Sequence, residues 1–369
     1  MSSIPPLKTK DGSWALTPAE KAALLAKTFA EKCQLPPPPE HQPVLASPTS
    51  ELSGFLLLRA RWVKRILKNI DPDKATGPDG LPGKLLKECA EALAPCIARL
   101  CRRLVQQGVW PDMWRDHWIH PLYKKGAHSH AGNYRGVHLT PVLSKVVERA
   151  IGRLFLPFLE RSGAYGANQW AFRPGHSCRD LVTLRVLTWI LAAHRGKKTG
   201  LFLSDISGAF DRVDVDILMG KFRRAGLGYI LVRFLADFFK PRRAQVIVQG
   251  AASAMWVICN QVYQGTVLGP PSWSVFFSDV AEAVIEAEHD EDLFADDLTC
   301  EKSVLKDVPD DDVFKELREC QARVHAWGVA NRVQFDPKKE EFKIMHPRLG
   351  WGHVPVSGRA SGHSAEDAR

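Results

Sequence analysis

Asp296 and Asp297 are adjacent carboxylates set between short apolar segments of the chain. Packing explains such a pair poorly, because buried carboxylates are costly unless they are paired or bind a metal. A strand-turn-strand hairpin would place the two acids at its tip, and Asp205 ends another apolar segment upstream. Three carboxylates at strand ends favour a Mg²⁺ site, since oxygen ligands suit a hard cation. Two ions held in this way can activate an attacking hydroxyl and stabilise a leaving oxygen in phosphoryl transfer.

Each of these acids also has a simpler explanation when it is taken alone. Asp205 follows residues 201–204, which are largely apolar on both faces like a central strand, but a single aspartate there fits a helix cap or a turn. Asp211 and Arg212 fit a charge pair at a helix start on a solvated face, and Phe210 fits the core. The metal-site interpretation therefore depends on the combination of Asp205 with the adjacent pair.

The segment Gln264–Pro271 is a glycine-containing loop that precedes a predicted helix. Backbone N–H groups in such a loop can approach a phosphate or a nucleotide, although a Gly-Pro turn is more often only a turn. The dinucleotide-binding and P-loop glycine patterns are not matched anywhere in the chain. The loop thus points to nucleotide chemistry only in combination with the acids.

The chain of 369 residues carries a formal net charge of +9, which suits a polyanionic partner such as nucleic acid. Arg135, Lys124, Lys125 and Lys74 lie in predicted turns, from which they can reach phosphates, although each also fits a solvated surface. The histidines at 117, 120, 128, 130 and 138 lack a metal-ligand spacing and are interpreted as surface or core residues.

Composition indicates an ordinary globular protein, 45% hydrophobic and 25% charged. Its eight cysteines form no C-x-x-C pair and no zinc-finger spacing, which favours a reduced intracellular setting, either nucleus or cytoplasm. There is no secretion signal at the start and no apolar run long enough to span a membrane, so neither secretion nor membrane insertion is expected.

Hydrophobic periodicity predicts a mixture of helices and strands without regular alternation, and hence an α+β fold. A proline-rich linker is expected to follow a first helix and to end near residue 50, and the tail after residue 346 is expected to be disordered. Predicted helices cover residues 14–33, 52–69, 83–107, 143–159, 181–193, 217–225, 230–239, 273–288 and 313–329, and predicted strands cover 118–123, 201–206, 244–249, 333–335 and 341–345.

The order of several motifs resembles that of the reverse transcriptases of non-LTR (LINE-type) retrotransposons, from about residue 66 to residue 346. The segments that carry the resemblance are Lys74–Gly80, Asn133–Arg135, Ala171–Ser177, Asp205 with Ala209–Asp211, Gln264–Gly265 with Leu268–Pro270, Phe294–Asp297 and Asp336–Lys339. Departures from the family pattern occur at Gly136, Tyr263, Ser272, Ser274 and Asp336, and none of them removes an expected metal ligand.

The resemblance implies a right-hand polymerase with fingers over residues 51–200 and a palm with an antiparallel sheet over 201–346, after an N-terminal helix and linker over 1–50 and before a tail over 347–369. The helical thumb of the family is expected to be missing, which suggests a fragment of a polyprotein or a decayed copy. Asp205, Asp296 and Asp297 would be catalytic and would hold two Mg²⁺ ions, with Mn²⁺ as an alternative. Nucleotide binding would involve Arg135, Phe210, Gln264, Gly265 and Lys339.

The implied reaction is RNA-directed DNA synthesis, in which a primer 3′-hydroxyl attacks the α-phosphate of a dNTP. Expected partners are an RNA template, a DNA primer, dNTPs and other parts of a retroelement polyprotein. Two alternatives stay open: a catalytically inactive nucleic-acid-binding remnant with the same fold, and an RNA-directed RNA polymerase.

Overall fold

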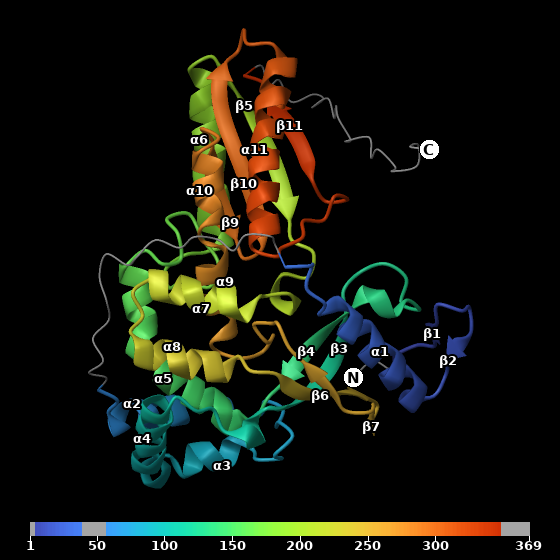
Figure 1. Ribbon diagram of the computed structural model, residues 1–369, viewed down its shortest axis with the longest axis vertical. Coiled ribbons are helices and arrows are strands. Elements are labelled where there is room, and N and C mark those ends of the chain that lie inside the picture. The colour runs from blue at the N-terminus through green and yellow to red at the C-terminus, as the bar shows by residue number, and fades with distance from the viewer. Residues whose placement is uncertain (1–3, 39–56, 348–369) are drawn as a thin grey trace. The chain divides into compact units, whose positions relative to one another are not determined.

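Residues 4–38 and 57–347 are described by the computed structural model, in which two units alternate along the chain (Figure 1). The first unit contains the described residues up to Pro37, residues 57–164 and Gly208–Phe276, and the second contains Tyr165–Ser207 and the described residues from Phe277 onward. Beyond residue 57 the chain therefore enters the second unit twice, at Tyr165 and at Phe277, and returns to the first unit once, at Gly208. These boundaries differ from a division at residue 200, and the assignment of fingers and palm stays a prediction. The predicted tail and most of the predicted linker lie outside the described residues.

The first unit is built on a mixed sheet in the order β4-β3-β6-β7, with β8 also paired to β6. Strand β3 runs antiparallel to β4 and parallel to β6, while β7 and β8 run antiparallel to β6. The strands of this unit are β1 Leu7–Lys8, β2 Trp14–Ala15, β3 Asp116–Tyr123, β4 Tyr134–Leu139, β6 Arg242–Val248, β7 Ala251–Ala252 and β8 Trp256–Ile258.

Helices surround this sheet and supply most of the core of the first unit. They are α1 Pro18–Lys32, α2 Ala60–Lys68, α3 Gly83–Glu88, α4 Ala90–Gln107, α5 Val142–Arg161, α7 Val215–Arg224, α8 Tyr229–Phe238 and α9 Gly269–Phe277, with 3-10 turns η1 Asp112–Trp114, η2 Ala131–Asn133 and η3 Ala209–Asp211. Helix α1 begins at Pro18 and not at residue 14 as predicted, because Thr17 and Glu20 form a reciprocal capping box that satisfies backbone N–H groups at its start, and Trp14 and Ala15 form β2.

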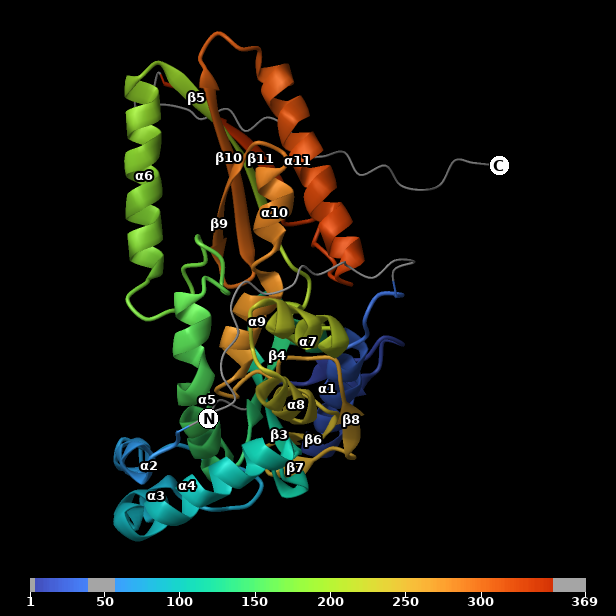
Figure 2. The same cartoon turned by 60° about the vertical axis from the view of Figure 1, so that its left-hand side comes forward.

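The second unit contains a four-stranded antiparallel sheet in the order β11-β5-β10-β9. Its strands are β5 Lys197–Asp205, β9 Asp290–Phe294, β10 Asp297–Leu305 and β11 Glu341–Met345, and its helices are α6 Cys178–His194, α10 Val280–Ile285 and α11 Asp310–Ala330. Figure 2 shows α6 on one side of this sheet and α10 with α11 on the other. A close approach fixes α11 on its side, since a Cβ on Gly200 of β5 would lie 2.6 Å from Val313 Cγ1. The antiparallel sheet and mixed composition confirm the predicted α+β class.

Several predicted elements were wrong in detail. Among the described residues, the helix expected over 52–69 begins only at Ala60. The helix expected over 83–107 is two helices that break at Cys89, whose φ of −86° and ψ of 15° lie outside the helical range. The helix expected over 273–288 is likewise α9 followed by α10. In both cases apolar residues recur similarly on the two sides of the break, so periodicity cannot show it. The strand expected over 333–335 is only an isolated bridge between Phe335 and Ile206.

No helix in the described ranges has both the length and the apolar character needed to cross a membrane.

Candidate active site

Asp205 and Asp297 are directly opposite each other in the sheet of the second unit. Strand β5 ends at Asp205 and β10 begins at Asp297, and the two residues are register partners in the antiparallel pair. Partners of this kind point to the same face, with Cβ atoms roughly 4.5–5.5 Å apart. Residues 205 and 297 are 92 positions apart in sequence, so the register of the sheet alone brings them together.

Asp296 lies in the turn between β9 and β10, as the predicted hairpin tip required. Phe294 and Asp297 are partners at the end of this hairpin, which leaves a connection of two residues, Ala295 and Asp296. Ala295 has a φ of +60°, a left-handed conformation that a tight hairpin turn needs at this position and that alanine adopts at a cost. All three predicted carboxylates therefore belong to one end of the same sheet.

Lys339 contacts the Asp205 carboxylate through an ion pair between Lys339 Nζ and Asp205 Oδ2. The turn that carries this lysine is fixed to the end of β5, because the Asp336 N–H donates to the Asp205 carbonyl over 3.0 Å and the Lys339 N–H donates to the Asp336 carbonyl over 2.9 Å. The Asp205 side chain is only 15% exposed. Its negative charge is thus balanced by the ammonium group of Lys339.

The carboxylate oxygens at this end of the sheet have the right chemistry for a hard divalent ion. Within the part of the chain that the structure describes, however, no three His, Cys, Asp or Glu side chains are grouped so that they could hold a metal together. Asp205, Asp296 and Asp297 thus have oxygen donors of the right type and share one end of the sheet, but they do not form a closed ligand set here, and the cationic partner of Asp205 is Lys339.

The turn with Asp296 is held by Gln169, a residue that the sequence motifs did not single out. Gln169 is fully buried, and its side-chain amide bonds both the N–H and the carbonyl of Ala295. Gln169 lies two residues before the segment Ala171–Ser177 that carries part of the family resemblance, so proximity to that motif is the only signal that the sequence offered.

The predicted nucleotide-binding residues other than Lys339 belong to the first unit. Arg135 is exposed on β4, and Phe210 lies in η3 with its ring stacked on Trp273 at 5.7 Å between centroids. Phe210 is also tied to the segment before the glycine loop, because its carbonyl accepts the Val262 N–H over 3.0 Å. Gln264 is tied to β4 in turn, since its carbonyl accepts the His138 N–H over 3.2 Å. Within the first unit, η3, the glycine loop and β4 are therefore joined by backbone hydrogen bonds.

Glycine is required at position 265 by geometry. Gly265 has a φ of +95°, and a Cβ built there would lie 2.4 Å from the carbonyl oxygen of His138. The loop that follows is held from α5 by Glu148, whose Oε2 accepts the N–H groups of Val267 and Leu268 at 2.6 and 3.2 Å. Burial raises the pKa of Glu148 above its ordinary value. The only sequence signal for this role was a glutamate among apolar positions of a predicted helix.

The histidines of the first unit include two core residues, which confirms that part of the sequence interpretation. His117 and His138 are buried, and their Nδ1 atoms lie 2.9 Å apart. Arg242 contacts His117 Nε2 at 2.9 Å and lies over the ring of Tyr263. Burial, followed by the charge of Arg242, lowers the pKa of His138 to about 3, so this imidazole is neutral near pH 7.

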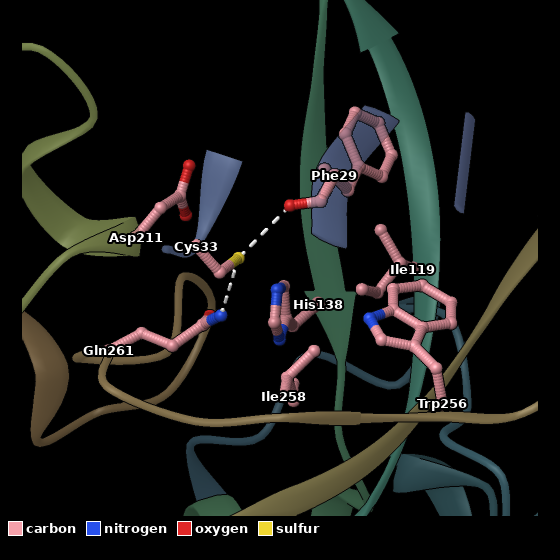
Figure 3. A pocket seen from close by; sticks show the side chains of 9 residues that line it. Phe29, Cys33, Ile119, His138, Asp211, Trp256, Ile258 and Gln261 are labelled. Carbon is pink, nitrogen blue, oxygen red and sulfur yellow. Dashed lines mark hydrogen bonds between the residues drawn. The ribbon is translucent and has the colours of Figure 1, made fainter. Parts of the chain in front are cut away.

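A pocket in the first unit lies beside η3 and is lined by Asp211, Cys33, Gln261, His138 and Trp256 among others (Figure 3). Gln261 Nε2 donates to Cys33 Sγ over 3.0 Å across the pocket wall. Burial raises the pKa of Asp211 to about 6, although the charges of Lys32 and Arg212 oppose this shift. The interpretation of Asp211 as part of a charge pair on a solvated face was wrong, because Asp211 is half-buried and lines a pocket whose other walls come from α1, β3, β4, β8 and the segment after β8.

Comparison with known proteins places this sequence in a family. Residues 122–354, more than half of the chain, match the family model described as "Reverse transcriptase (RNA-dependent DNA polymerase)". The chain belongs to the reverse transcriptase family. Two similar relatives are the "RNA-directed DNA polymerase from mobile element jockey" of Drosophila melanogaster, 28% identical over 81% of this chain and 34% of the relative, and the "Probable RNA-directed DNA polymerase from transposon X-element" of the same fly, 28% identical over 79% and 33%.

These matches confirm the resemblance to LINE-type reverse transcriptases, and the chain spans about a third of the length of the curated relatives that it matches. Two departures from the reverse transcriptase pattern have a structural reason here. A Cβ on Gly136 would lie 2.7 Å from Ile119 Cγ2, so any larger residue would need space that β3 occupies. Tyr263 is fully buried, and its hydroxyl donates to the Lys240 carbonyl over 2.9 Å.

Proposed function

We propose that this chain is the catalytic region of an RNA-directed DNA polymerase. Under the direction of an RNA template, a primer 3′-hydroxyl would attack the α-phosphate of a dNTP, so that the nucleoside monophosphate is added to the primer and pyrophosphate leaves. The observation that carries the proposal is the register that sets Asp205 opposite Asp297, with Asp296 in the adjoining turn, in a chain of the reverse transcriptase family. Fingers over residues 51–200 and a palm over 201–346 form part of the same proposal.

Asp205 and Asp296 would hold two Mg²⁺ ions, or Mn²⁺, and Asp297 would complete the acidic cluster. When bound, such ions polarise the phosphate and lower the pKa of the attacking hydroxyl. The sheet register restricts Asp205 and Asp297 to one face, and the Ala295–Asp296 turn keeps the third carboxylate at the same edge. Lys339 supplies positive charge beside Asp205, which suits a role near the phosphates of the incoming nucleotide.

The nucleotide would be held by residues of the first unit. Arg135 is exposed on β4 and can bind phosphate oxygens in a bidentate manner. Phe210 would exclude a ribose 2′-hydroxyl, and its stacking on Trp273 limits the freedom of the ring. Gln264 and Gly265 would line the nucleotide and template site. The proposed partners are an RNA template, a DNA primer and dNTPs, which the net charge of +9 suits, together with other parts of a retroelement polyprotein.

Primer extension on poly(rA)/oligo(dT) with Mg²⁺ tests the proposal. We expect the wild-type chain to extend the primer and Asp296→Asn to lower the rate by at least about 100-fold, because loss of a metal ligand costs more than loss of an outer contact. Asp290→Asn is the matched control, since Asp290 is an exposed aspartate at the far end of β9. Absence of wild-type extension, or equal rates for Asp296→Asn and wild type, would refute the proposal.

Two observations favour a second candidate, a nucleic-acid-binding remnant without catalysis. The described residues hold no grouped set of three metal ligands, and Lys339 is paired with Asp205. Tight binding of primer-template without extension in either Mg²⁺ or Mn²⁺ would establish this alternative. An RNA-directed RNA polymerase is separated by offering rNTPs in place of dNTPs. Under the leading proposal the wild type prefers dNTPs, and Phe210→Ala relaxes that preference.

A further inference from the structure

The Gln169 side chain makes two hydrogen bonds to the backbone of the turn that carries Asp296, much as a neighbouring strand would do. Its Oε1 accepts the Ala295 N–H over 3.0 Å, and its Nε2 donates to the Ala295 carbonyl over 3.3 Å. The same Oε1 also accepts the Ala171 N–H over 2.9 Å. Since Gln169 has no exposed surface, water cannot easily replace these bonds if the side chain is removed.

The bonds to Gln169 fall on the one strained residue of the hairpin. Ala295 has a φ of +60°, and an L-residue with a Cβ pays about 1–2 kcal/mol for the left-handed region. A side chain that binds both polar groups of this residue favours the left-handed conformation over its alternatives. The next residue along the chain is Asp296, so the conformation of Ala295 sets the backbone from which Asp296, and after it Asp297, project.

Gln169 is itself held at a fixed distance from β9. The Leu293 N–H donates to the Asn168 carbonyl over 2.9 Å, and the Trp170 N–H donates to the Leu293 carbonyl over 2.8 Å. The guanidinium of Arg173 donates to the carbonyls of Gly166 and Gln169, both over 3.1 Å. Arg173 belongs to the segment that resembles the family motif, which thereby acquires a structural role through Gln169.

We propose that Gln169 is a positioning residue that keeps the Ala295–Asp296 turn in its left-handed conformation and so aims Asp296 and Asp297 for cation binding. This inference rests on the proposed function for its catalytic consequence. Its structural part, the restraint of the turn by Gln169, can be measured without any catalysis.

The structural part is tested by hydrogen exchange of the full chain, read by mass spectrometry on peptides that cover residues 293–298. Gln169→Met keeps the length of the side chain and removes the amide. We expect the Ala295 amide to exchange at least about fivefold faster in this variant, as loss of one buried hydrogen bond requires. The matched control is Asn168→Leu, which removes a bond to Glu291 on the same strand but away from the turn. Unchanged exchange in Gln169→Met, or an equal change in the control, would overturn the proposal.

The effect of Gln169 on cation binding by Asp296 and Asp297 is tested with the same variants. Their affinity for Mn²⁺ is measured by electron paramagnetic resonance. We expect Gln169→Met to weaken Mn²⁺ binding about 10–100-fold, as loss of an outer contact does, while Asn168→Leu binds like the wild type. Ala295→Gly in the Gln169→Met background should recover at least half of the loss on a logarithmic scale, because glycine adopts positive φ without cost. Unweakened Mn²⁺ binding in Gln169→Met, or no recovery with glycine, would refute the positioning role.

Primer extension adds a readout that distinguishes this proposal from the proposed function. We expect Gln169→Met to lower kcat and raise the Mg²⁺ concentration for half-maximal rate, with the KM for dNTP unchanged. A wild-type chain that binds Mn²⁺ through a Gln169-restrained turn but never extends a primer would refute the polymerase function and leave the restraint standing. A chain that extends primers with the Gln169→Met variant unimpaired would refute the positioning role alone.

Discussion

We predict that Arg185 of α6 stabilises the sheet of the second unit by neutralising two buried carboxylates. Its guanidinium forms an ion pair with Asp292 on β9 and donates to Glu301 Oε1 on β10 over 2.8 Å. The side chains of Asp292 and Glu301 are 3% and 5% exposed. Arg185→Met would keep most of the apolar stem and leave both buried carboxylates without their cation, so we expect the free energy of unfolding to fall by about 3–5 kcal/mol at pH 8.

The pH dependence of this loss follows from the pKa of Asp292. Burial raises that pKa to about 6 in the folded wild type, although Arg185 lowers it, and the ordinary value is 3.8. Because the pKa of Asp292 is higher in the folded state, the protonated carboxyl favours folding. Its contribution to the free energy of unfolding is therefore largest below about pH 4 and is lost as the pH rises towards 6. Without Arg185 the pKa of folded Asp292 rises further, so the free energy of unfolding continues to fall up to a higher pH. The difference between Arg185→Met and wild type should therefore be smallest near pH 4 and largest near pH 8.

Urea denaturation followed by circular dichroism at pH 4.5 and pH 8 measures this difference. Arg179→Met is the matched control, because Arg179 is exposed on the same helix and its substitution should change stability by no more than about 0.5 kcal/mol. A loss below about 1 kcal/mol at pH 8, or a loss that does not shrink on acidification, would show that the two carboxylates do not depend on Arg185.

Three further predictions concern the first unit. Gly265→Ala should lower the free energy of unfolding by about 2–4 kcal/mol, because the new Cβ meets both a positive φ and the His138 carbonyl oxygen. Gly250→Ala, at a φ of +84° with open space around it, should lower it by only about 1–2 kcal/mol. Thermal unfolding of both variants measures this difference, and equal losses would contradict a role for the His138 contact. Asp211→Asn should raise the free energy of unfolding by up to about 3 kcal/mol at pH 8, because burial raises the pKa of Asp211 from 3.8 to about 6 and so penalises the charged carboxylate. This gain in stability should disappear as the pH falls from 6 to 4. A gain that does not change with pH in urea titrations would argue against this cause. Glu148→Leu should lower the free energy of unfolding by about 2–4 kcal/mol, since the Val267 and Leu268 N–H groups lose a buried acceptor. Glu148→Gln keeps an acceptor oxygen and should lower it by less than half as much. Equal urea midpoints for the two variants would contradict the role of the acceptor.

Local sequence determined much of the secondary structure and one part of the site. The capping box at Thr17 and Glu20 set the start of α1, because its hydrogen bonds lie within one helical turn. The apolar flanks of Asp296 and Asp297 predicted a hairpin with the acids at its end, because both strands and the turn are contiguous in the chain. The family resemblance added Lys339, whose ion pair with Asp205 puts it beside one of the three predicted carboxylates.

Only the tertiary structure decided the features that depend on residues distant in sequence. The partnership of Asp205 with Asp297 is a matter of register between β5 and β10, and a shift by one residue would turn one acid to the opposite face. The pocket beside Asp211, the Gln169 amide against Ala295 and the Arg185 ion pairs arise from elements that meet only after folding. Side-chain period and local caps carry information over a few residues, whereas burial and register depend on what the remaining chain places opposite each residue.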